Sequence, residues 1–282
     1  MPNIAIHLHL HYVEQLDDIL RLLHFLDGTQ YDLFVTVTER NDAVKQQILA
    51  FKPEAKILLV PNLGYDIGPF IDFLHRINLD SYDYILKIHT KRRQNNHYCL
   101  FDGRRFTMKT WGDMLFDALL HSSQAFRHNL KIMADNPDVG MLGSSFVLTA
   151  DEISYSNVLE RGELEMSNLG LQIPSDKHFI AGTMFLVRTK LLTPFLHYKI
   201  SDFSSVESNI HDDTLAHVLE RMFCWAVTAQ GYQIRGVQYK SFGLECFRAS
   251  FRRFLYQKKN TRNGKLIVKI CKIPVYYGKA AQ

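Results

Sequence analysis

Cysteines are scarce in this sequence, and long apolar runs are missing. Its 282 residues include four cysteines, Cys99, Cys224, Cys246 and Cys271, with no CxxC pair among them. Their spacing argues against a cysteine zinc site and fits a reducing compartment. No apolar run approaches the length of a membrane span, and Met1–Asn3 lead directly into a strand-like segment. We therefore expect neither a spanning helix nor a signal peptide.

Several standard catalytic and nucleotide-binding motifs are missing as well. No GxGxxG follows the first strand-like segment, which argues against a nicotinamide-binding Rossmann enzyme. The chain also has no GxxxxGK(S/T), GxSxG or HExxH motif. With 46% hydrophobic and 22% charged residues, it can nevertheless bury a sizeable core.

Strand and helix patterns alternate through the first ninety residues. The expected elements are a strand in Asn3–Tyr12, a helix in Val13–Leu26, a strand in Tyr31–Thr38, a helix from a cap at Asn41 to Phe51, a strand at Ile57–Val60, a helix over Phe70–Ile77 and a strand at Tyr84–Ile88. Such alternation predicts an α/β fold with a mostly parallel sheet flanked by helices. We expect a single domain over residues 1–239 and a basic, aromatic extension over 240–282.

The later segments are less regular. We expect a loop over His89–Arg105, helices over Trp111–Leu120 and Ser123–Asn136, a strand over Val139–Phe146, an insertion without clear periodicity over Ala150–Asp176, one strand over Phe179–Arg188 interrupted at Gly182, a short helix from Lys190, a polar loop over Ser201–Ser208, a helix over Asp212–Gln230 and a last strand in Tyr232–Tyr239.

Two apolar strands each run into a polar loop, and such strand ends carry the ligand sites of open α/β sheets. In the first loop, Gly64 and Gly68 permit close backbone approach. Pro69 suits a first helical turn, whose free N–H groups favour an anion such as a diphosphate. Asp66 is expected to cap that helix, and a ligand contact is the alternative.

The second strand ends in His89-Thr90-Lys91-Arg92, a combination of imidazole, hydroxyl and cations that suits phosphate. A basic surface loop is the alternative reading of these four residues. We expect the two neighbouring inner strand ends to form one cradle, with Asp66 and His89 sharing a cavity.

Two further segments can contribute to a site. The small-residue break at Gly182 and Thr183 lets a ligand approach the backbone. On the late helix, Asp213, His217 and Glu220 are spaced to share a face, so an acid/base cluster is possible. An acidic cap with an ordinary pair inside the helix is the alternative.

Both ends of the chain carry a feature with competing interpretations. His7, His9 and His11 alternate along the first strand, where polar neighbours or solvent are favoured over a metal. Residues 240–282 hold eleven Lys/Arg and one acidic residue. This extension can lie on an anionic membrane or be a solvated, partly disordered end. No recognised motif supports nucleic-acid binding.

Taken together, the segments Asn62–Phe70, Leu86–Lys91, Ala181–Phe185 and His217–Arg221 resemble the rhamnan synthesis protein F family, over about Ile4 to Tyr239. Members are associated with bacterial surface polysaccharides and look like glycosyltransferases. The resemblance implies a GT-A-like fold, a nucleoside-diphosphate sugar donor and a lipid-linked or growing O-antigen, capsule or rhamnan acceptor. It also implies a cytoplasmic protein, which can be peripheral on the inner face of the plasma membrane.

The residues expected to bind substrate are Asn62, Gly64, Tyr65, Asp66, Gly68, His89, Thr90, Lys91, Arg92, Gly182, Thr183 and Arg221. Asp213 or Glu220 would be the base, with His217 beside them, and inversion is the expected outcome. No DxD motif occurs in the chain. We therefore expect no metal cofactor, with Lys91 and Arg92 offsetting diphosphate charge, although a divalent ion stays open. The alternative function is a non-catalytic glycan or nucleotide-sugar binding module of an assembly complex.

Overall fold

Two units make up the chain in the computed structural model, which describes residues 2–92, 98–101, 104–150, 156–205, 214–260 and 265–279. The first unit comprises Met1–Lys91 and Met114–Tyr239. The second comprises Arg92–Asp113 and Lys240–Gln282. Nearly all of the predicted site residues belong to the first unit.

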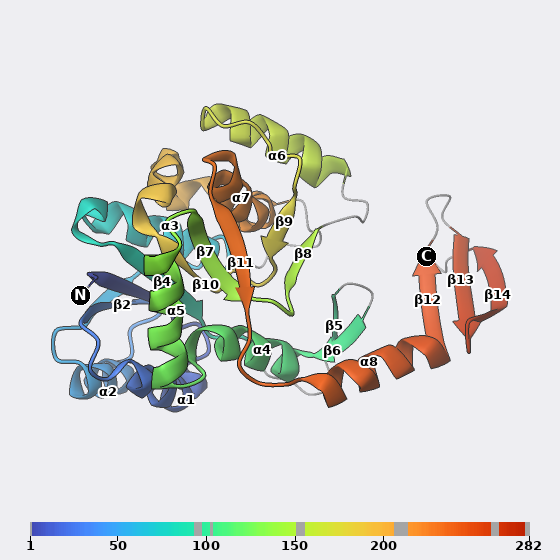
Figure 1. Cartoon of the computed structure of the whole chain (residues 1–282), viewed down its shortest axis with the longest axis horizontal. Helices are drawn as coiled ribbons and strands as arrows, with labels where there is room; N and C mark the ends of the chain where they lie inside the picture. The colour runs from blue at the N-terminus through green and yellow to red at the C-terminus, as the bar shows by residue number, and fades with distance from the viewer. Residues whose placement is uncertain are drawn as a thin grey trace. The chain divides into compact units, whose positions relative to one another are not determined.

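A seven-stranded sheet forms the centre of the first unit (Figure 1). Its strands are β1 (Ile4–His9), β2 (Tyr31–Val37), β3 (Lys56–Leu59), β4 (Tyr84–His89), β7 (Val139–Ser144), β10 (Phe185–Arg188) and β11 (Gln233–Val237). They lie in the order β11-β7-β10-β4-β1-β2-β3. Only β10 runs antiparallel to its neighbours, β4 and β7. The predicted α/β fold with a mostly parallel sheet is confirmed.

Helices cover both faces of this sheet (Figure 1). The helices between these strands along the chain are α1 (Leu16–Leu23) between the 3-10 helices η1 (Val13–Gln15) and η2 (His24–Leu26), α2 (Asp42–Phe51), α3 (Ile67–Arg76), η3 (Leu79–Ser81), α4 (Met108–Leu120), α5 (Ser123–Asp135), α6 (Ser156–Asn168), η4 (Thr189–His197), η5 (Ile200–Asp202) and α7 (Leu215–Ala229). The expected cap of α2 is present, since Asn41 accepts a hydrogen bond from the N–H of Val44. Strands β1, β2 and β3 follow one another toward one edge of the sheet. The chain then returns through α3 to β4, on the other side of β1. Right-handed crossovers therefore place α3 on the face opposite α1 and α2.

The strand order corrects one expectation about the site. β3 is an edge strand, and β1 and β2 separate it from β4. The two loop-bearing strands are therefore not neighbours. The loop after β3 nevertheless leads into α3, which packs against β1 and β2, and so returns to the end of β4.

Three predictions for the middle of the chain are wrong. Residues expected to form a loop contain a hairpin, β5 (Tyr98–Phe101) and β6 (Arg104–Thr107). The expected insertion contains α6, whose buried positions recur once per turn at Val158 and Met166 with Gly162 between them. A side chain at Gly162 would meet Trp225, so this helix has too few apolar residues to show its period.

The expected strand over Phe179–Arg188 is two strands. The first, β9 (His178–Ile180), pairs with β8 (Leu148–Ala150) outside the main sheet, and the second is β10. Gly182 and Thr183 between them both have positive φ angles, 94° and 51°. The chain therefore turns at this point instead of continuing as a strand.

The second unit carries regular structure in its C-terminal part. Helix α8 (Gly243–Leu255) is followed by an antiparallel sheet of β12 (Tyr256–Asn260), β13 (Lys265–Ile270) and β14 (Ile273–Lys279). These described segments therefore form a helix and a sheet, whereas the sequence left a solvated, partly disordered end as one interpretation. None of the helices within the described residues is both long and apolar enough to cross a membrane.

Candidate functional site

A stripe of polar side chains crosses the sheet beneath α3. His7 and His9 of β1 lie in parallel register with Lys87 and His89 of β4, so all four point to the same face. Each is at most 3% exposed. The ring of His7 stacks on Phe73 of α3, at 4.7 Å between centroids. Buried polar groups of this kind need hydrogen-bond or charge partners.

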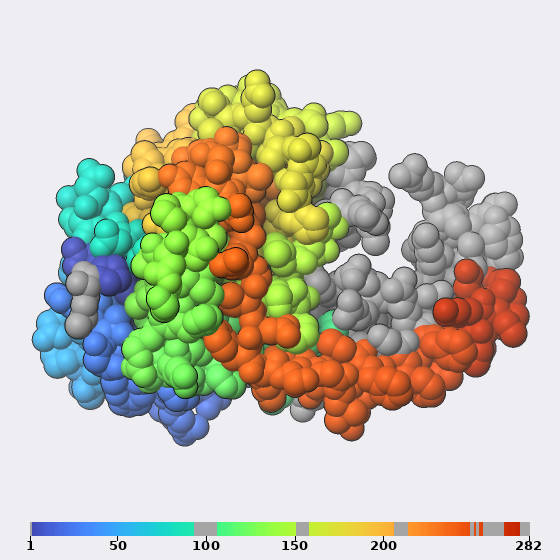
Figure 2. Space-filling model, viewed as in Figure 1, coloured from blue at the N-terminus to red at the C-terminus, as the bar shows by residue number. Residues whose placement is uncertain are grey.

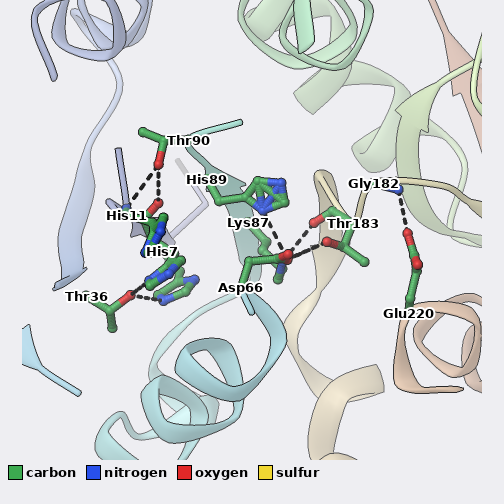
Figure 3. A network of polar contacts seen from close by, with 11 residues as sticks. His7, His11, Thr36, Asp66, Lys87, His89, Thr90, Gly182, Thr183 and Glu220 are labelled. Carbon is green, nitrogen blue, oxygen red and sulfur yellow. Dashed lines mark hydrogen bonds and ion pairs between the residues drawn. The ribbon is translucent and has the colours of Figure 1, made fainter. Parts of the chain in front are cut away.

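Asp66, at the start of α3, supplies the partner of Lys87 (Figure 3). The Nζ atom of Lys87 donates to Oδ2 of Asp66, to the carbonyl oxygen of Thr183 at 2.9 Å and to Oγ1 of Thr183 at 3.1 Å. The hydroxyl of Thr183 also donates to Asp66. An ammonium, a carboxylate and a hydroxyl thus form one closed network.

Strand β10 brings Thr183 to this place. Phe185 pairs with Lys87 in the antiparallel register. Continuing that register backwards sets Thr183 level with His89 at the same edge of the sheet. The left-handed backbone at Gly182 and Thr183 then turns both the carbonyl and the hydroxyl of Thr183 toward Lys87.

His89 lies beside this network but makes no hydrogen bond to it. Its Nδ1 atom is 3.0 Å from Oδ2 of Asp66, without hydrogen-bond geometry. Neither ring nitrogen has a hydrogen-bond partner among the described residues, although the side chain is buried. A buried imidazole in this state is a candidate ligand contact.

The charges in the network are set by burial and by one another. Burial opposes ionisation of Asp66, but His89, Lys87 and Lys91 hold the pKa of that carboxyl well below its usual range. Burial lowers the pKa of Lys87, which the Asp66 carboxylate opposes. Burial also lowers the pKa of His89 to well below its usual value. The charged forms of Asp66 and Lys87 therefore stabilise each other, and burial keeps the imidazole of His89 uncharged at neutral pH.

Helix α7 joins the same region through Glu220 and His217. Oε1 of Glu220 accepts a hydrogen bond of 2.7 Å from the N–H of Gly182 (Figure 3). The ring of His217 lies edge-on to Tyr65, 5.4 Å between centroids, and its Nδ1 atom is 2.7 Å from Oγ1 of Thr214. The four segments singled out in the sequence therefore meet at one end of the sheet.

Several residues predicted to bind substrate are exposed or make contacts within the fold. Asn62 is exposed. Oγ1 of Thr90 accepts hydrogen bonds from the N–H groups of His11 and Tyr12, which ties the end of β4 to the loop after β1. Arg221 is buried, donates to the carbonyl of His217 and lies over the ring of Phe179. Its guanidinium therefore has a role inside the fold.

The remaining predicted residues divide between the two units. The backbone of Lys91 is held by Gln15, whose side-chain nitrogen donates to the Lys91 carbonyl at 2.7 Å. Arg92 belongs to the second unit. Asp213 lies outside the described residues.

The loop before α3 differs from the expected anion site. The N–H groups of Ile67 and Gly68 both donate to the carbonyl of Gly64, and Phe70 donates to Asp66. Pro69 has no N–H, so the first turn has no free donor for a diphosphate. Asp66 makes no side-chain cap, so the cap interpretation is wrong and its carboxylate serves the network instead.

The histidines of β1 have polar partners, as one interpretation expected. Nε2 of His7 and Nδ1 of His9 both lie 3.0 Å from Oγ1 of Thr36 on β2. Burial lowers the pKa of His9 to about 4 and that of His7 well below its usual value. Within the described residues no cluster of three or more His, Cys, Asp or Glu can hold a metal ion.

Lys87 is the site residue that the sequence interpretation missed. It interrupts the apolar run Tyr84–Ile88, and the side chain is completely buried. A lysine in an inner strand needs a carboxylate partner, because burying an unpaired ammonium is very costly. That requirement was the available signal, and Asp66 satisfies it.

The fold and site define an α/β protein with a buried charge network at the carboxyl ends of its central strands. The chain belongs to the family described as Rhamnan synthesis protein F, whose model matches residues 1–232. The family prediction is thereby confirmed.

Curated relatives extend the comparison without assigning an activity. The Uncharacterized protein WxcX of Xanthomonas campestris pv. campestris (strain B100) is 26% identical over 245 residues, which is 84% of this chain and 33% of the relative. WxcX of strain ATCC 33913 gives the same identity and the same coverage. This chain therefore spans about a third of the length of these relatives.

Solved structures of lower similarity include three proteins. S. aureus TarS 1-349 has a TM-score of 0.46 at 10% identity, covering 85% of this chain and 59% of that one. The galactosyltransferase LgtC, with donor and acceptor sugar analogs, has 0.41 at 12%, covering 82% and 72%. The mannosyltransferase PcManGT of Pyrobaculum calidifontis, with GDP-Man and Mn2+, has 0.43 at 12%, covering 90% and 63%. With TM-scores below 0.5, these likenesses do not determine the function of this chain.

Proposed function

We propose that this protein is a glycosyltransferase. It moves a sugar, rhamnose-like or another hexose, from a nucleoside-diphosphate sugar to a lipid-linked or growing bacterial surface polysaccharide. The observation that carries the proposal is the buried imidazole of His89, which has no hydrogen-bond partner among the described residues and stands beside the Asp66–Lys87 pair at the strand ends. Membership of the Rhamnan synthesis protein F family supports the substrate class.

The proposed role of the network is to hold the donor. Asp66 is already ionised and fixed by Lys87, so its carboxylate is a rigid acceptor for donor hydroxyls. The uncharged His89 donates one N–H to a donor oxygen. The Asp66 carboxylate offsets the positive charge of Lys87, and the further positive charge of Lys91 favours the diphosphate that leaves.

The transfer step needs a base for the acceptor hydroxyl. As that hydroxyl oxygen bonds to the anomeric carbon, the bond from that carbon to the diphosphate oxygen breaks and the electron pair leaves with the diphosphate. The hydroxyl proton passes to a carboxylate on or just before α7, Glu220 or Asp213. Glu220 is supported by its fixed position against Gly182. Direct displacement would invert the anomeric configuration.

The side chains at this site are poor ligands for a divalent metal ion. The segment His89-Thr90-Lys91 has no carboxylate, and the ammonium of Lys87 occupies one oxygen of the nearby Asp66. A cation there would meet a positive neighbour at close range. We therefore propose that protein cations offset the diphosphate charge without a metal cofactor.

The acceptor sets the proposed location. A lipid-linked acceptor and a nucleotide-sugar donor meet at the inner face of the plasma membrane. We place the protein in the cytoplasm, at that face. No nucleic acid takes part in this proposal.

The test is sugar transfer, or slow hydrolysis, with a panel of nucleotide sugars in the presence and absence of a chelator. We expect one nucleotide sugar to raise the melting temperature and to be turned over equally with chelator present. Activity that is abolished by chelator and restored by manganese or magnesium would contradict the metal-free site. Binding without any turnover would instead indicate a non-catalytic nucleotide-sugar module.

A further inference from the structure

Helix α8 in the second unit presents an apolar face that the described protein leaves uncovered. Its members are Leu244, Phe247, Phe251, Phe254 and Leu255. At about 100° per residue, these positions fall within an arc of about 100° on the helix. Phe247 is 66% exposed and Leu244 57%, and the rings of Phe247 and Phe251 stack at 6.1 Å. Side chains of α8 lie at the surface in the view of Figure 2, where the helix is orange.

The apolar side chains are not confined to the helix. The end of β13 and strand β14 expose Ile270, Ile273, Val275 and Tyr276. Lys272, in the turn between β13 and β14, lies over the ring of Phe254, with its Nζ atom 5.9 Å from the ring centroid. Both α8 and the small sheet of the same unit thus expose apolar side chains, and Lys272 lies among them.

The charge of the segment is strongly positive. Residues 240–282 contain eleven Lys/Arg and the single acidic residue Glu245, a net charge of +10. The whole chain has a net charge of +4, so the other 239 residues sum to −6. A second copy would bring the same +10 to a shared α8 face, which disfavours self-association through it. An anionic surface with an apolar interior complements both the charge and the exposed rings.

We infer that the apolar face of α8 is a membrane-docking surface that inserts into the headgroup region of an anionic phospholipid bilayer. The basic residues of 240–282 are attracted by the surface charge, and the aromatic and leucine side chains leave water as the helix settles in the interface. This docking surface consists only of residues of the second unit. The inference therefore holds or fails independently of the proposed transfer reaction.

The experiment uses the full chain in flotation with lipid vesicles. We compare phosphatidylcholine vesicles with vesicles in which part of that lipid is replaced by phosphatidylglycerol. The expected result is flotation with the anionic vesicles alone, weakened by high salt. The double variant F247S/F251S should lower the partition coefficient about tenfold or more, because two exposed rings no longer enter the interface.

The matched control is Leu164→Ser on α6, a leucine that is 61% exposed in the first unit. It should leave flotation unchanged, and circular dichroism should show that each variant is folded. Three results would overturn the inference: no flotation of the wild-type chain, equal flotation of F247S/F251S, or sedimentation showing a dimer that this double variant dissolves. A chain that floats but transfers no sugar would leave the docking surface intact and count only against the proposed function.

Discussion

Lys87 and Asp66 form an ion pair beneath α3, 21 residues apart in the sequence and on different elements. The lysine side chain is fully buried, and the carboxylate is 17% exposed. This pair joins the loop after an edge strand to an inner strand that is three strands away in the sheet. One charge contact therefore fixes both the position of the loop and the electrostatics of the site.

Removing the ammonium tests this relationship. Lys87→Met keeps the length and apolar bulk of the side chain but leaves Asp66 without its cation. We expect the free energy of unfolding to fall by about 3 kcal/mol, because breaking a buried pair strands the remaining charge. Urea denaturation measures this loss. Lys56→Met, at an exposed lysine of β3 in the same sheet, should cost less than about 1 kcal/mol. Equal stabilities of the two variants would contradict the structural role of the pair.

Substituting the imidazole of His89 tests the proposed donor contact. His89→Phe keeps a ring in the buried space and removes both nitrogens. We expect the dissociation constant for the nucleotide sugar to rise about tenfold to a hundredfold, since a hydrogen bond to an anionic ligand is lost. Calorimetric titration measures this constant. His7→Phe is the matched control on β1, because Nε2 of His7 is already paired with Thr36. Its binding should be unchanged, and a loss as large as that of His89→Phe would argue against a specific contact.

Replacing the candidate bases separates catalysis from binding. Glu220→Gln preserves an oxygen that can accept the hydrogen bond from Gly182 but cannot take up a proton. If Glu220 is the base, kcat should fall about a hundredfold or more while donor binding stays within a few-fold of the wild type. Asp213→Asn is the companion variant. Steady-state kinetics of both variants identify the base, and unchanged kcat in both would remove α7 from the mechanism.

The sequence predicted the architecture well because its strongest signals were periodic. Alternating apolar positions and caps gave the β-α order up to β4, and Asn41 caps α2 as expected. The strand order was not available from periodicity, since the placement of β3 at the edge depends on crossovers through space. Helix α6 was missed because its buried face uses one apolar residue per turn and a glycine against Trp225.

The candidate site could be predicted only in part, because local patterns do not show contacts through space. Residues at strand ends, such as Asp66 and His89, could be named, but their contact requires the sheet to be folded. The position of Asp66 just before α3 predicts a helix cap. Its carboxylate instead pairs with Lys87, which is distant in the sequence. Lys87 itself lies inside an apolar run, where the local pattern predicts only a strand. Local patterns cannot show that a buried charge has a partner elsewhere.

The buried histidines predict how stability depends on pH. The pKa of His9 falls from its usual 6.5 to about 4 on folding. The unfolded chain therefore binds a proton below pH 6.5 that the folded chain refuses until about pH 4, so stability is lost as pH falls through this window. Since the side chain is buried, we expect a loss of about 3 kcal/mol from His9. His7 and His89, whose pKa values burial also lowers, act in the same direction.

Urea denaturation between pH 7 and pH 4 measures this slope. His9→Asn should flatten it, because the variant side chain has no group that titrates in this window. A wild-type stability that stays level across the window would show that the buried imidazoles are protonated without cost. The Asp66 carboxyl adds a loss only at lower pH, where it begins to bind a proton in the unfolded chain.

Gly64 tests how the loop before α3 is held. Its φ angle is 68°, and an added Cβ would lie 2.6 Å from the ring of Phe203. Gly64→Ala therefore combines left-handed strain with a steric clash, and we expect a loss of roughly 3 kcal/mol together with weaker donor binding. Gly28 has a φ angle of 83° but open space around its Cβ position. Gly28→Ala should cost only about 1 kcal/mol and leave binding intact. Urea denaturation and calorimetry of the two variants distinguish the effects, and equal losses would mean that Phe203 yields freely and does not fix the loop that carries Asp66.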